Sequence, residues 1–497
     1  MATHSPSNYT DDLDRPSAAL VERLRSVLDG PANGTRRVVR VQVPVAEATA
    51  PIQWLRGQAG TEGVYWSGRS PAVTTSEGPR LQGAACRDGS AEPRVVAGVG
   101  QADVVTAEQR PVDYDALRRR LADRLRRADD AVRYYGGLRF DAPQPAEGAL
   151  PSPAWRRFGA YRFVLPRFEL VQRGERQALA CNLVLPRDRE QAPALLEAAR
   201  ALTVSASAPD AALPAPLSRV DRPTKDDWTQ MVRWVLDAIA TDRVEKVVLA
   251  RQVELALGRG VDPAGVLHHL KAATPGCFHF ALRPPAGPAF LGASPERLFR
   301  WQDRQVVCDA LAGTRGRGDT PEADAALREE LLTSEKERRE HAFVQTAIEE
   351  DLEAVCTAVE GPERPSELLL ARGRHLHARL TGTLRPDVTA VELLAALHPT
   401  PAVGGVPRDA ALGAIRAQEP FDRGWYAGPV GWIGADAAEF AVGIRSGLVW
   451  PDRLALYSGA GIVEGSVPDR EWDEIEQKIA DFAAVLGLLD RSNGAAR

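Results

Sequence analysis

The chain of 497 residues contains few cysteines, few lysines and no long apolar run. Its five cysteines are scattered without a Cys-x-x-Cys pair, which favours reduced thiols in a cytoplasmic protein over a disulfide scaffold. No stretch approaches ~18 consecutive apolar residues, and no basic segment followed by an apolar one opens the chain, so we expect no membrane span and no signal peptide. The net charge of -5, without a long basic run, argues against nucleic acid or an anionic membrane as the main partner.

Lysine is scarce because arginine supplies almost all of the 62 basic residues. Arginine cannot lose its proton in a protein, whereas a buried lysine can become a neutral base. The remaining lysines are therefore candidates for chemistry that arginine cannot perform, although any one of them could also remain by chance. The five are Lys225, Lys246, Lys271, Lys336 and Lys478.

The length suggests about three domains, although one large α+β unit is also possible. Residues 1–35 are expected to form a polar tail with one short helix, and 36–204 an α+β half of the fold. Segment 205–225, rich in Pro, Ala and Ser, is the best candidate for a linker. A second α+β region at 226–490 and a polar tail at 491–497 complete the chain. Strands with interspersed helices predict an α+β fold with β-sheets packed between helices.

Two predicted helices each begin with a pair of glutamates that are three residues apart. "SEKERREHAFVQTAIEEDLEAV" carries Glu337 and Glu340, and "DREWDEIEQKIADFAAVLGLL" carries Glu471 and Glu474. Positions three, four and seven residues apart share one face of a helix. The acids therefore continue the apolar face of each helix toward its N-terminal end, so we expect them to point inward.

Four inward carboxylates would destabilise the fold by several kcal/mol if no cation compensated them. Oxygen ligands without His or Cys suit Mg²⁺, which takes one or two protein carboxylates and completes its shell with water and substrate oxygens. A buried network of ion pairs with arginine is the alternative.

Eight motifs beyond the predicted linker closely resemble the chorismate-binding enzymes, and among them the isochorismate synthases. The resemblance is strong over about 225–490, the expected chorismate-binding catalytic region, and extends weakly into the N-terminal half through "YYGGLRFD" and "FVLPRFEL". It implies the large α+β fold of anthranilate synthase component I. The motifs are "KVVLAR", "GASPERL", "LAGTRGRG", "SEKERREH", "HPTPAVGGVPR", "RGWYAGPVGW", "EFAVGIRS" and "GAGIVEGS", in this order.

The resemblance implies a Mg²⁺-dependent attack of water at C2 of chorismate with loss of the C4 hydroxyl. Lys246 matches the general base of the family, and Glu296 in "SPERL" matches the general acid. A general acid must be protonated near neutral pH, so we expect an apolar or acidic neighbourhood to raise the pKa of Glu296. An exposed strand lysine and a turn glutamate are the alternative roles.

The resemblance also assigns the remaining site residues. Glu340 and Glu474 match the Mg²⁺ ligands, with Glu337 and Glu471 just behind them, and the metal would bridge to the C1 carboxylate of chorismate. His375 matches a histidine near the substrate ring, although a core histidine is an open alternative. The other positions that match substrate-binding residues are Gly313, Thr314, Ala402, Tyr426, Arg445, Lys478 and the backbone amides of Gly459, Ala460 and Gly461.

Single residues separate the branches of the family. Aminodeoxychorismate synthases carry a nucleophilic lysine where this chain has Ala312, and anthranilate synthases lack the base that Lys246 supplies. Salicylate synthases typically carry threonine where this chain has Ala402, which is the isochorismate-synthase pattern. Asp309 stands where relatives often have glutamate, and the sequence does not explain this shortening.

Two alternatives to an isochorismate synthase stay open at this point. A salicylate synthase would remove pyruvate in the same site, and a non-catalytic chorismate-pocket protein would bind without turnover. Nothing in the chain resembles the glutaminase that aminating relatives recruit, and we expect a monomer. The downstream route, whether a siderophore, menaquinone or salicylate, depends on neighbouring enzymes.

Overall fold

The computed structural model describes residues 16–30, 36–46, 49–58, 62–69, 94–108, 111–141, 152–203, 213–371, 373–486 and 488. The predicted tail at 491–497 and residues 1–15 of the N-terminal tail lie outside the described residues.

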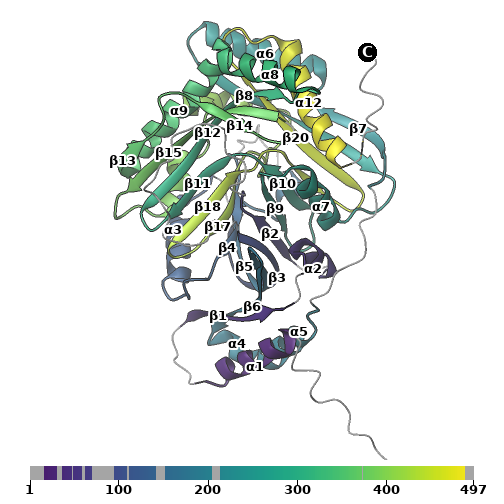
Figure 1. Cartoon of the computed structure of the whole chain (residues 1–497), viewed down its shortest axis with the longest axis vertical. Coiled ribbons are helices and arrows are strands. Elements are labelled where there is room, and N and C mark those ends of the chain that lie inside the picture. The colour runs from purple at the N-terminus through teal and green to yellow at the C-terminus, as the bar shows by residue number, and fades with distance from the viewer. Residues whose placement is uncertain are drawn as a thin grey trace, which may run out of the picture.

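The strands of these described residues join into one hydrogen-bonded network of antiparallel pairs, with helices packed on its faces (Figure 1). The predicted α+β class is therefore confirmed. The helices are α1 (Pro16–Leu28), α2 (Pro51–Gly57), α3 (Tyr114–Leu125), the 3-10 turn η1 (Pro153–Trp155), α4 (Arg187–Glu190), α5 (Ala192–Arg200), α6 (Lys225–Ala240), α7 (Pro263–Ala273), α8 (Pro321–Thr333), α9 (Glu335–Val355), α10 (Ala390–Leu397), α11 (Arg408–Gln418) and α12 (Pro468–Val485). The strands are β1 (Arg37–Val45), β2 (Gly63–Ser67), β3 (Arg94–Ala107), β4 (Tyr134–Leu138), β5 (Tyr161–Arg173), β6 (Arg176–Leu185), β7 (Pro216–Arg222), β8 (Lys246–Leu257), β9 (Phe278–Arg283), β10 (Ala289–Ser294), β11 (Arg297–Gln302), β12 (Gln305–Gly316), β13 (Cys356–Glu360), β14 (Ser366–Leu369), β15 (Gly373–Leu384), β16 (Gly405–Val406), β17 (Pro429–Ile433), β18 (Ala437–Val442), β19 (Ser446–Val449) and β20 (Arg453–Ile462).

The network divides into two arms at the long strand β5, which pairs with β3, β4 and β6. One arm runs from β3 through β2, β9, β10, β19 and β20 to β8. The other arm runs from β4 through β17, β18, β11 and β12 to β15. Both arms therefore contain strands from each half of the chain, and the two halves share one sheet network rather than forming separate sheets.

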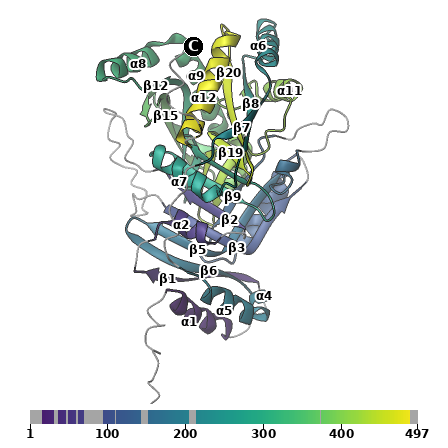
Figure 2. The ribbon, with the colours of Figure 1, turned by 90° about the vertical axis from the view of Figure 1, so that its right-hand side faces the viewer.

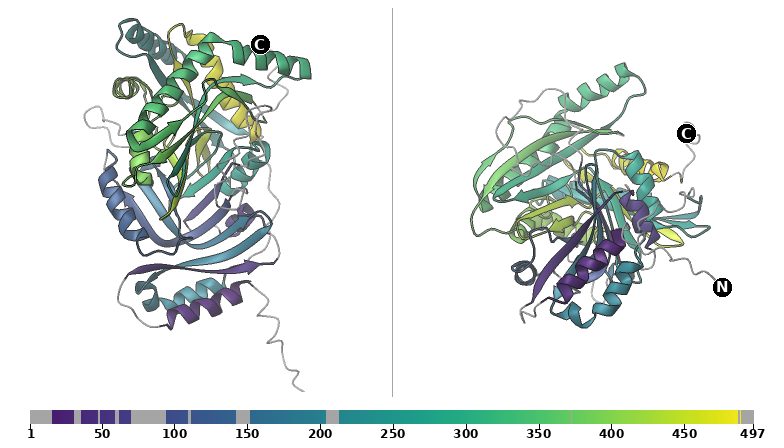
Figure 3. Two further views of the ribbon diagram at one scale, coloured as in Figure 1. Left: turned by 60° about the vertical axis from the view of Figure 1, so that its left-hand side comes forward. Right: turned by 60° about the horizontal axis from the view of Figure 1, so that its bottom comes forward.

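The N-terminal half ends in a layer of helices at one end of the molecule. Helices α1, α4 and α5 cover β1 and β6 at the base of the view, while α6, α8, α9 and α12 gather at the opposite end (Figures 1 and 2). The left-hand view of Figure 3 shows the same separation, with the purple α1 far from the yellow α12. Leu20 and Leu24 of α1 are fully buried in the same apolar cluster as Leu179 and Leu183 of β6, which fixes this layer.

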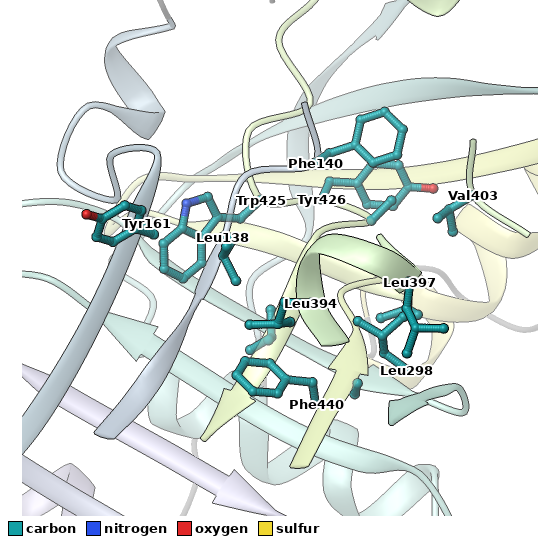
Figure 4. Packing of buried hydrophobic residues seen from close by; sticks show 14 of the residues in the cluster. Leu138, Phe140, Tyr161, Leu298, Leu394, Leu397, Val403, Trp425, Tyr426 and Phe440 are labelled. Atoms are coloured by element: carbon teal, nitrogen blue, oxygen red, sulfur yellow. The ribbon is translucent and has the colours of Figure 1, made fainter. Parts of the chain in front are cut away.

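A second apolar cluster fills the space between the two arms. The rings of Trp155, Phe158, Phe290 and Trp425 meet edge to face at centroid distances of 5.3 to 6.5 Å, a preferred geometry for aromatic pairs. Figure 4 shows Tyr426 beside Phe140 and Val403 at one margin of this cluster. The packed core thus leads directly to residues that line the candidate site.

Part of the predicted linker is a strand. Residues 216–222 form β7 and pair with β8, and Thr224 caps α6 by accepting a hydrogen bond from the Asp227 amide. The linker prediction is therefore wrong for this part, because backbone pairing to a neighbouring strand stabilises a segment whose composition and exposed side chains suggest a coil. The rest of the predicted linker up to residue 212 lies outside the described residues.

Helix α6 has one buried apolar face. Trp228, Met231, Val232 and Val235 lie on this face. No helix in the described part of the chain is long and apolar enough to cross a membrane.

Candidate active site

A cavity of about 120 Å³ lies between the two arms. Strands β8 and β20 form one wall, β12 and β15 form the opposite wall, and the first turns of α9 and α12 border it. Its lining residues are Val248, Pro295, Glu296, Leu311, Ala312, Gly313, Thr314, Lys336, Glu337, Glu340, His375, Ala402, Val403, Tyr426, Ile444, Arg445, Tyr457, Ser458, Gly459, Gly461, Glu471, Glu474 and Lys478.

All four glutamates at the helix starts line this cavity, as their helical spacing predicts. Ser334 begins α9 by accepting a hydrogen bond from the Glu337 amide, and Pro468 occupies the first turn of α12. Glu337 and Glu471 are buried, whereas the side chains of Glu340 and Glu474 are 17% and 44% exposed. Glu340 and Glu474, the more exposed pair, are the residues matched to direct metal ligands. Glu337 and Glu471, the buried pair, are the residues expected behind these ligands.

Each of these carboxylates contacts a basic side chain. The distances are 3.0 Å from Lys246 Nζ to Glu340 Oε1, 3.1 Å from Lys336 Nζ to Glu471 Oε1, 2.7 Å from Lys478 Nζ to Glu474 Oε1 and 2.8 Å from Arg315 Nη1 to Glu337 Oε1. The ion-pair network that the sequence left open is thus present, with lysine rather than arginine in three of the four pairs.

The described residues hold no group of three or more His, Cys, Asp or Glu side chains close enough to bind a metal ion together. Two exposed carboxylates beside one cavity instead fit a cation whose remaining ligands are water and substrate, which is how Mg²⁺ is commonly bound. The donor chemistry of Glu340 and Glu474 therefore fits Mg²⁺, provided that the substrate completes the shell.

Lys246 is the first residue of β8 and is completely buried. It does not line the cavity itself, but contacts Glu340, which does. Its Nζ makes no hydrogen bond of acceptable geometry. A Cβ at Gly461 would lie 2.6 Å from Glu340 Oε1 and 3.0 Å from Lys246 Cε, so glycine at this position leaves the space that the pair occupies.

Glu296 lies in the turn between β10 and β11 and is 2% exposed. Its amide donates to Ser294 Oγ at 3.2 Å, and its buried Oε1 has no hydrogen-bond partner. Burial, together with the nearby charge of Asp309, raises the pKa of Glu296 to about 8, while Lys246 acts in the opposite direction. The carboxyl group is therefore protonated at neutral pH, in agreement with the expectation for a general acid.

His375 on β15 faces the end of β12. Its Nδ1 lies 3.0 Å from Thr314 Oγ1 and 3.2 Å from the Gly313 carbonyl oxygen. Burial lowers the pKa of His375 to about 3, so the ring is neutral at physiological pH. Gly313 has φ +70, and a Cβ there would lie 2.8 Å from Glu337 Oε2, which explains glycine at this turn.

Arg445 and Tyr426 provide polar groups on the wall next to β19 and β20. Arg445 has φ 50, an uncommon backbone conformation for a residue with a side chain, and its guanidinium forms no ion pair with the described residues. Tyr426 stacks on Tyr457 with ring centroids 5.1 Å apart. A cavity-facing guanidinium without a protein carboxylate is suited to an anionic ligand.

The predicted glycine segment of β20 is only partly at the cavity. Gly459 and Gly461 line it, and the Gly459 carbonyl accepts a hydrogen bond from Lys478 Nζ at 2.8 Å. Ala460 does not line it, because successive strand residues face opposite sides of the sheet. The Val248 and Ala250 amides donate away from β20, so Leu249 between them faces its partner Ala460, whose amide points toward β8. The expectation that the Ala460 amide holds a carboxylate is therefore wrong, whereas the amides of its two neighbours point away from β8.

Ala402 lies in the turn that follows α10, where the Thr400 carbonyl accepts from the Val403 and Gly404 amides at 3.1 and 2.9 Å. It is partly buried and lines the cavity. A larger side chain at this position would enter the same space.

Sequence reasoning missed three charged residues around the site. Lys336 lines the cavity, and its place among only five lysines was a signal. Asp309 and Arg69 form a buried ion pair behind Glu296, with 2.6 Å between Arg69 Nη2 and Asp309 Oδ2. Asp309 was noticed only as a departure from the family pattern, and Arg69 lies in the N-terminal half without any motif.

The comparisons with known proteins agree with this architecture. A family model described as chorismate binding enzyme matches residues 33–487. The chain therefore belongs to the chorismate-binding enzymes.

Curated relatives show which enzymes of this family the chain is similar to. The chain is 34% identical over 506 residues to the chloroplastic isochorismate synthase of Catharanthus roseus, an alignment that covers 96% of this chain and 85% of the relative. It is 30% identical over 459 residues to isochorismate synthase MenF of Escherichia coli strain K12, covering 92% and 95% of the two chains.

Solved structures share the fold. The structure of MenF, the menaquinone-specific isochorismate synthase from Escherichia coli, has a TM-score of 0.78 and 28% sequence identity and covers 95% of this chain and 100% of that one. Anthranilate synthase component I from Streptococcus pneumoniae has a TM-score of 0.64 at 20% identity, covering 84% and 98% of the two chains, which shows a common fold.

Proposed function

We propose that this chain is an isochorismate synthase that converts chorismate to isochorismate with Mg²⁺. The observation that carries the proposal is a cavity lined by a buried, protonated glutamate, Glu296, and by Glu340, which contacts the buried Lys246, in a chain 34% identical to an isochorismate synthase. Water adds to C2 of the ring while the C4 hydroxyl leaves as water, so the reaction is a net isomerisation.

Glu296 is the general acid in this proposal. Because burial keeps its carboxyl group protonated at neutral pH, it can give a proton to the departing C4 hydroxyl, and a positioned acid typically contributes ~10²–10⁴-fold to the rate. Its Oε1, without a protein partner, is free to face the substrate.

Lys246 is the general base. Its Nζ lacks a hydrogen bond of acceptable geometry and contacts only one carboxylate oxygen, Oε1 of Glu340, among the described ion pairs. A buried lysine can become a neutral amine, whereas arginine keeps its proton. In its neutral form, Lys246 would accept the proton of the attacking water.

Mg²⁺ would be held by Glu340 and Glu474, with Glu337 and Glu471 behind them, and would neutralise the C1 carboxylate of chorismate. Arg445 has no competing ion pair with any described residue, and Lys478, Tyr426 and the amides of Gly459 and Gly461 adjoin it along the same wall. These groups can hold the two carboxylates of the substrate. Neutral His375, kept in orientation by Thr314, would contact the ring.

The test is analysis of the products formed from chorismate and Mg²⁺ at early times. Isochorismate as the main product supports the proposal, and excess chelator should abolish turnover until Mg²⁺ is restored. Abundant early salicylate and pyruvate would instead identify a salicylate synthase, and tight chorismate binding without turnover would identify a non-catalytic pocket protein. Full activity in excess chelator would show that the reaction does not require Mg²⁺.

A further inference from the structure

A guanidinium from the N-terminal half reaches the turn that carries Glu296. Arg69 follows strand β2, and its side chain is 7% exposed. Its Nη1 donates a hydrogen bond to the Pro295 carbonyl at 2.8 Å, and its Nη2 donates to Asp309 Oδ2 at 2.6 Å. One side chain therefore bridges the residue immediately before Glu296 and a buried carboxylate on β12.

Asp309 is the centre of a buried cluster. Its side chain has no exposed surface, and its Oδ1 lies 3.1 Å from His377 Nε2. Arg297 Nη1 is 3.7 Å from Oδ2, and the guanidinium groups of Arg69 and Arg297 lie over the ring of Phe278 at 5.6 and 5.4 Å from its centroid. A carboxylate surrounded in this way holds a fixed position.

Three residues, Ser294, Val442 and Arg69, attach the turn around Glu296 through described hydrogen bonds. Ser294 Oγ accepts from the Glu296 amide at 3.2 Å, and the Glu296 carbonyl accepts from the Val442 amide at 3.1 Å. The third is the Arg69 bond to Pro295, 226 residues away in the sequence. It is the only one of the three that comes from the N-terminal half.

We propose that Arg69 is a positioning residue for the general acid Glu296, acting through the Pro295 carbonyl and Asp309. The inference rests on the proposed function, because it assumes that Glu296 donates the proton. It also gives the N-terminal half of the chain a role in catalysis. Arg69 and Asp309 do not line the cavity, so they act on the acid and not on substrate binding.

The charges around Glu296 support a role for this cluster. Asp309 raises the pKa of Glu296 and Lys246 of β8 lowers it. Charged groups from several elements balance the charge of Asp309. Removing one of these groups therefore changes the electrostatic potential at Glu296. These groups are Arg69 after β2, Arg297 of β11, and His377 and Arg379 of β15, while Glu439 of β18 pairs with Arg297.

The experiment compares Arg69→Met and Arg69→Lys with a matched control, Arg167→Met. Arg167 also bridges a buried aspartate and a backbone carbonyl, since it contacts Asp188 and donates to the Asn182 carbonyl at 2.8 Å. Both of its partners lie in the N-terminal half, away from the cavity. The control therefore measures the cost of losing such an arginine without any effect on Glu296.

Arg69→Met should lower kcat by about tenfold to a hundredfold, the scale of a misplaced catalytic group, while KM for chorismate changes by less than about twofold. Arg69→Lys should recover part of kcat, because an ammonium can still reach one of the two acceptors. Arg167→Met should keep the wild-type kcat even if its melting temperature falls. Hydrogen exchange of the segment around Glu296, measured without substrate, should accelerate in Arg69→Met and not in Arg167→Met.

The pH dependence of kcat/KM is an independent test of the proposal. Asp309→Asn should move the alkaline limb of kcat/KM to lower pH, because burial alone then raises the pKa of Glu296 and the added effect of the Asp309 charge is gone. Arg69→Met should leave that limb in place or move it to higher pH, because Asp309 is then less compensated. The proposal is wrong if Arg69→Met keeps the wild-type kcat, or loses no more than Arg167→Met, or leaves the exchange around Glu296 unchanged. A wild-type protein that forms no isochorismate would instead contradict the proposed function. The hydrogen-exchange measurement would then still test whether Arg69 fixes the segment around Glu296.

Discussion

The buried ion pairs of the N-terminal half and those of the cavity differ in the base that each uses. In the N-terminal half, Arg40 meets Glu169 at 2.9 Å with both side chains almost fully buried, and Arg162 binds Glu62 through two nitrogens. In the cavity, three of the four carboxylates at the starts of α9 and α12 contact lysines instead. The chain has only five lysines, so three of them serve this one site.

The difference follows from the chemistry of the two side chains. A guanidinium keeps its charge and holds a carboxylate through a rigid fork, whereas an ammonium is a single point charge that can give up a proton or move away. Permanent pairs in the N-terminal half therefore use arginine. In the proposed mechanism, lysine stands where a proton must be accepted or where a carboxylate must be released to another partner.

The largest effect is expected at Lys246. Replacement by Ala or by Arg should lower kcat by about 10²–10⁴-fold to a similar extent, because a fixed positive charge cannot accept a proton from water. The measurement is the rate of isochorismate formation at saturating chorismate and Mg²⁺. If the Arg variant kept most of the activity, Lys246 would serve only as a cation and the contrast between the two regions would have no chemical basis.

The next effect concerns the carboxylates that the lysines hold. Glu471→Gln should weaken Mg²⁺ binding by about 10–100-fold, as expected for a residue that supports a metal ligand, and Glu340→Gln should weaken it more. Titration calorimetry with Mg²⁺ in the presence of chorismate measures this. Glu476→Gln is the control on the same helix, because Glu476 pairs with Arg219 and Arg251 outside the cavity. Equal Mg²⁺ affinity in all variants would assign these acids to ion pairs alone.

The buried acid predicts a pH dependence. Because the pKa of Glu296 is raised to about 8, its proton is present at neutral pH and is lost as pH rises through that value. The rate should therefore fall on the alkaline side, and Glu296→Gln should abolish this limb while it lowers kcat and leaves chorismate binding largely intact. A wild-type alkaline limb that is unchanged in Glu296→Gln would assign the titration to another group.

A smaller effect is expected from Ala402→Thr. The added hydroxyl and methyl groups would enter the cavity, and a tenfold change in product ratio requires only ~1.4 kcal/mol between two barriers. Pyruvate formation, followed by coupling to lactate dehydrogenase, should rise above the low wild-type level. If it does not rise, the product specificity is set elsewhere in the cavity and the assignment of function is unaffected.

The smallest effect on catalysis is expected from Arg40→Lys in the N-terminal half. The change should reduce the free energy of unfolding by about 1–3 kcal/mol, because the lysine loses the guanidinium contacts with the buried Glu169 carboxylate and with Asn182 Oδ1, and it should leave kcat unchanged. Denaturant unfolding and steady-state kinetics measure the two quantities. A loss of kcat without a loss of stability would show that this pair, too, acts on the chemistry.

Much of the site could be predicted from local sequence. Helical spacing placed Glu337, Glu340, Glu471 and Glu474 on inward faces, because that inference needs only the geometry of one helix. The Lys478 contact of Glu474 is also local, since the two residues are four positions apart on α12. The partners of the other three acids could not be predicted, since Lys246, Lys336 and Arg315 each come from another element of the folded chain.

Three misses have different physical causes. Ala460 shares a motif with two cavity glycines, but strand alternation turns its amide toward β8. The segment 216–222 has the composition of a coil and is held as a strand by its pairing with β8. Arg69 depends on a contact across 226 residues, and no local pattern marks such a contact.

The most direct test of the account is a turnover of chorismate by the wild-type protein in water enriched with heavy oxygen. If Lys246 activates a water molecule that attacks C2, mass spectrometry should find one heavy oxygen atom in the isochorismate formed, located at C2. Unlabelled isochorismate would mean that the original hydroxyl moves within the substrate. That result would contradict the role of Lys246 as the base that activates water.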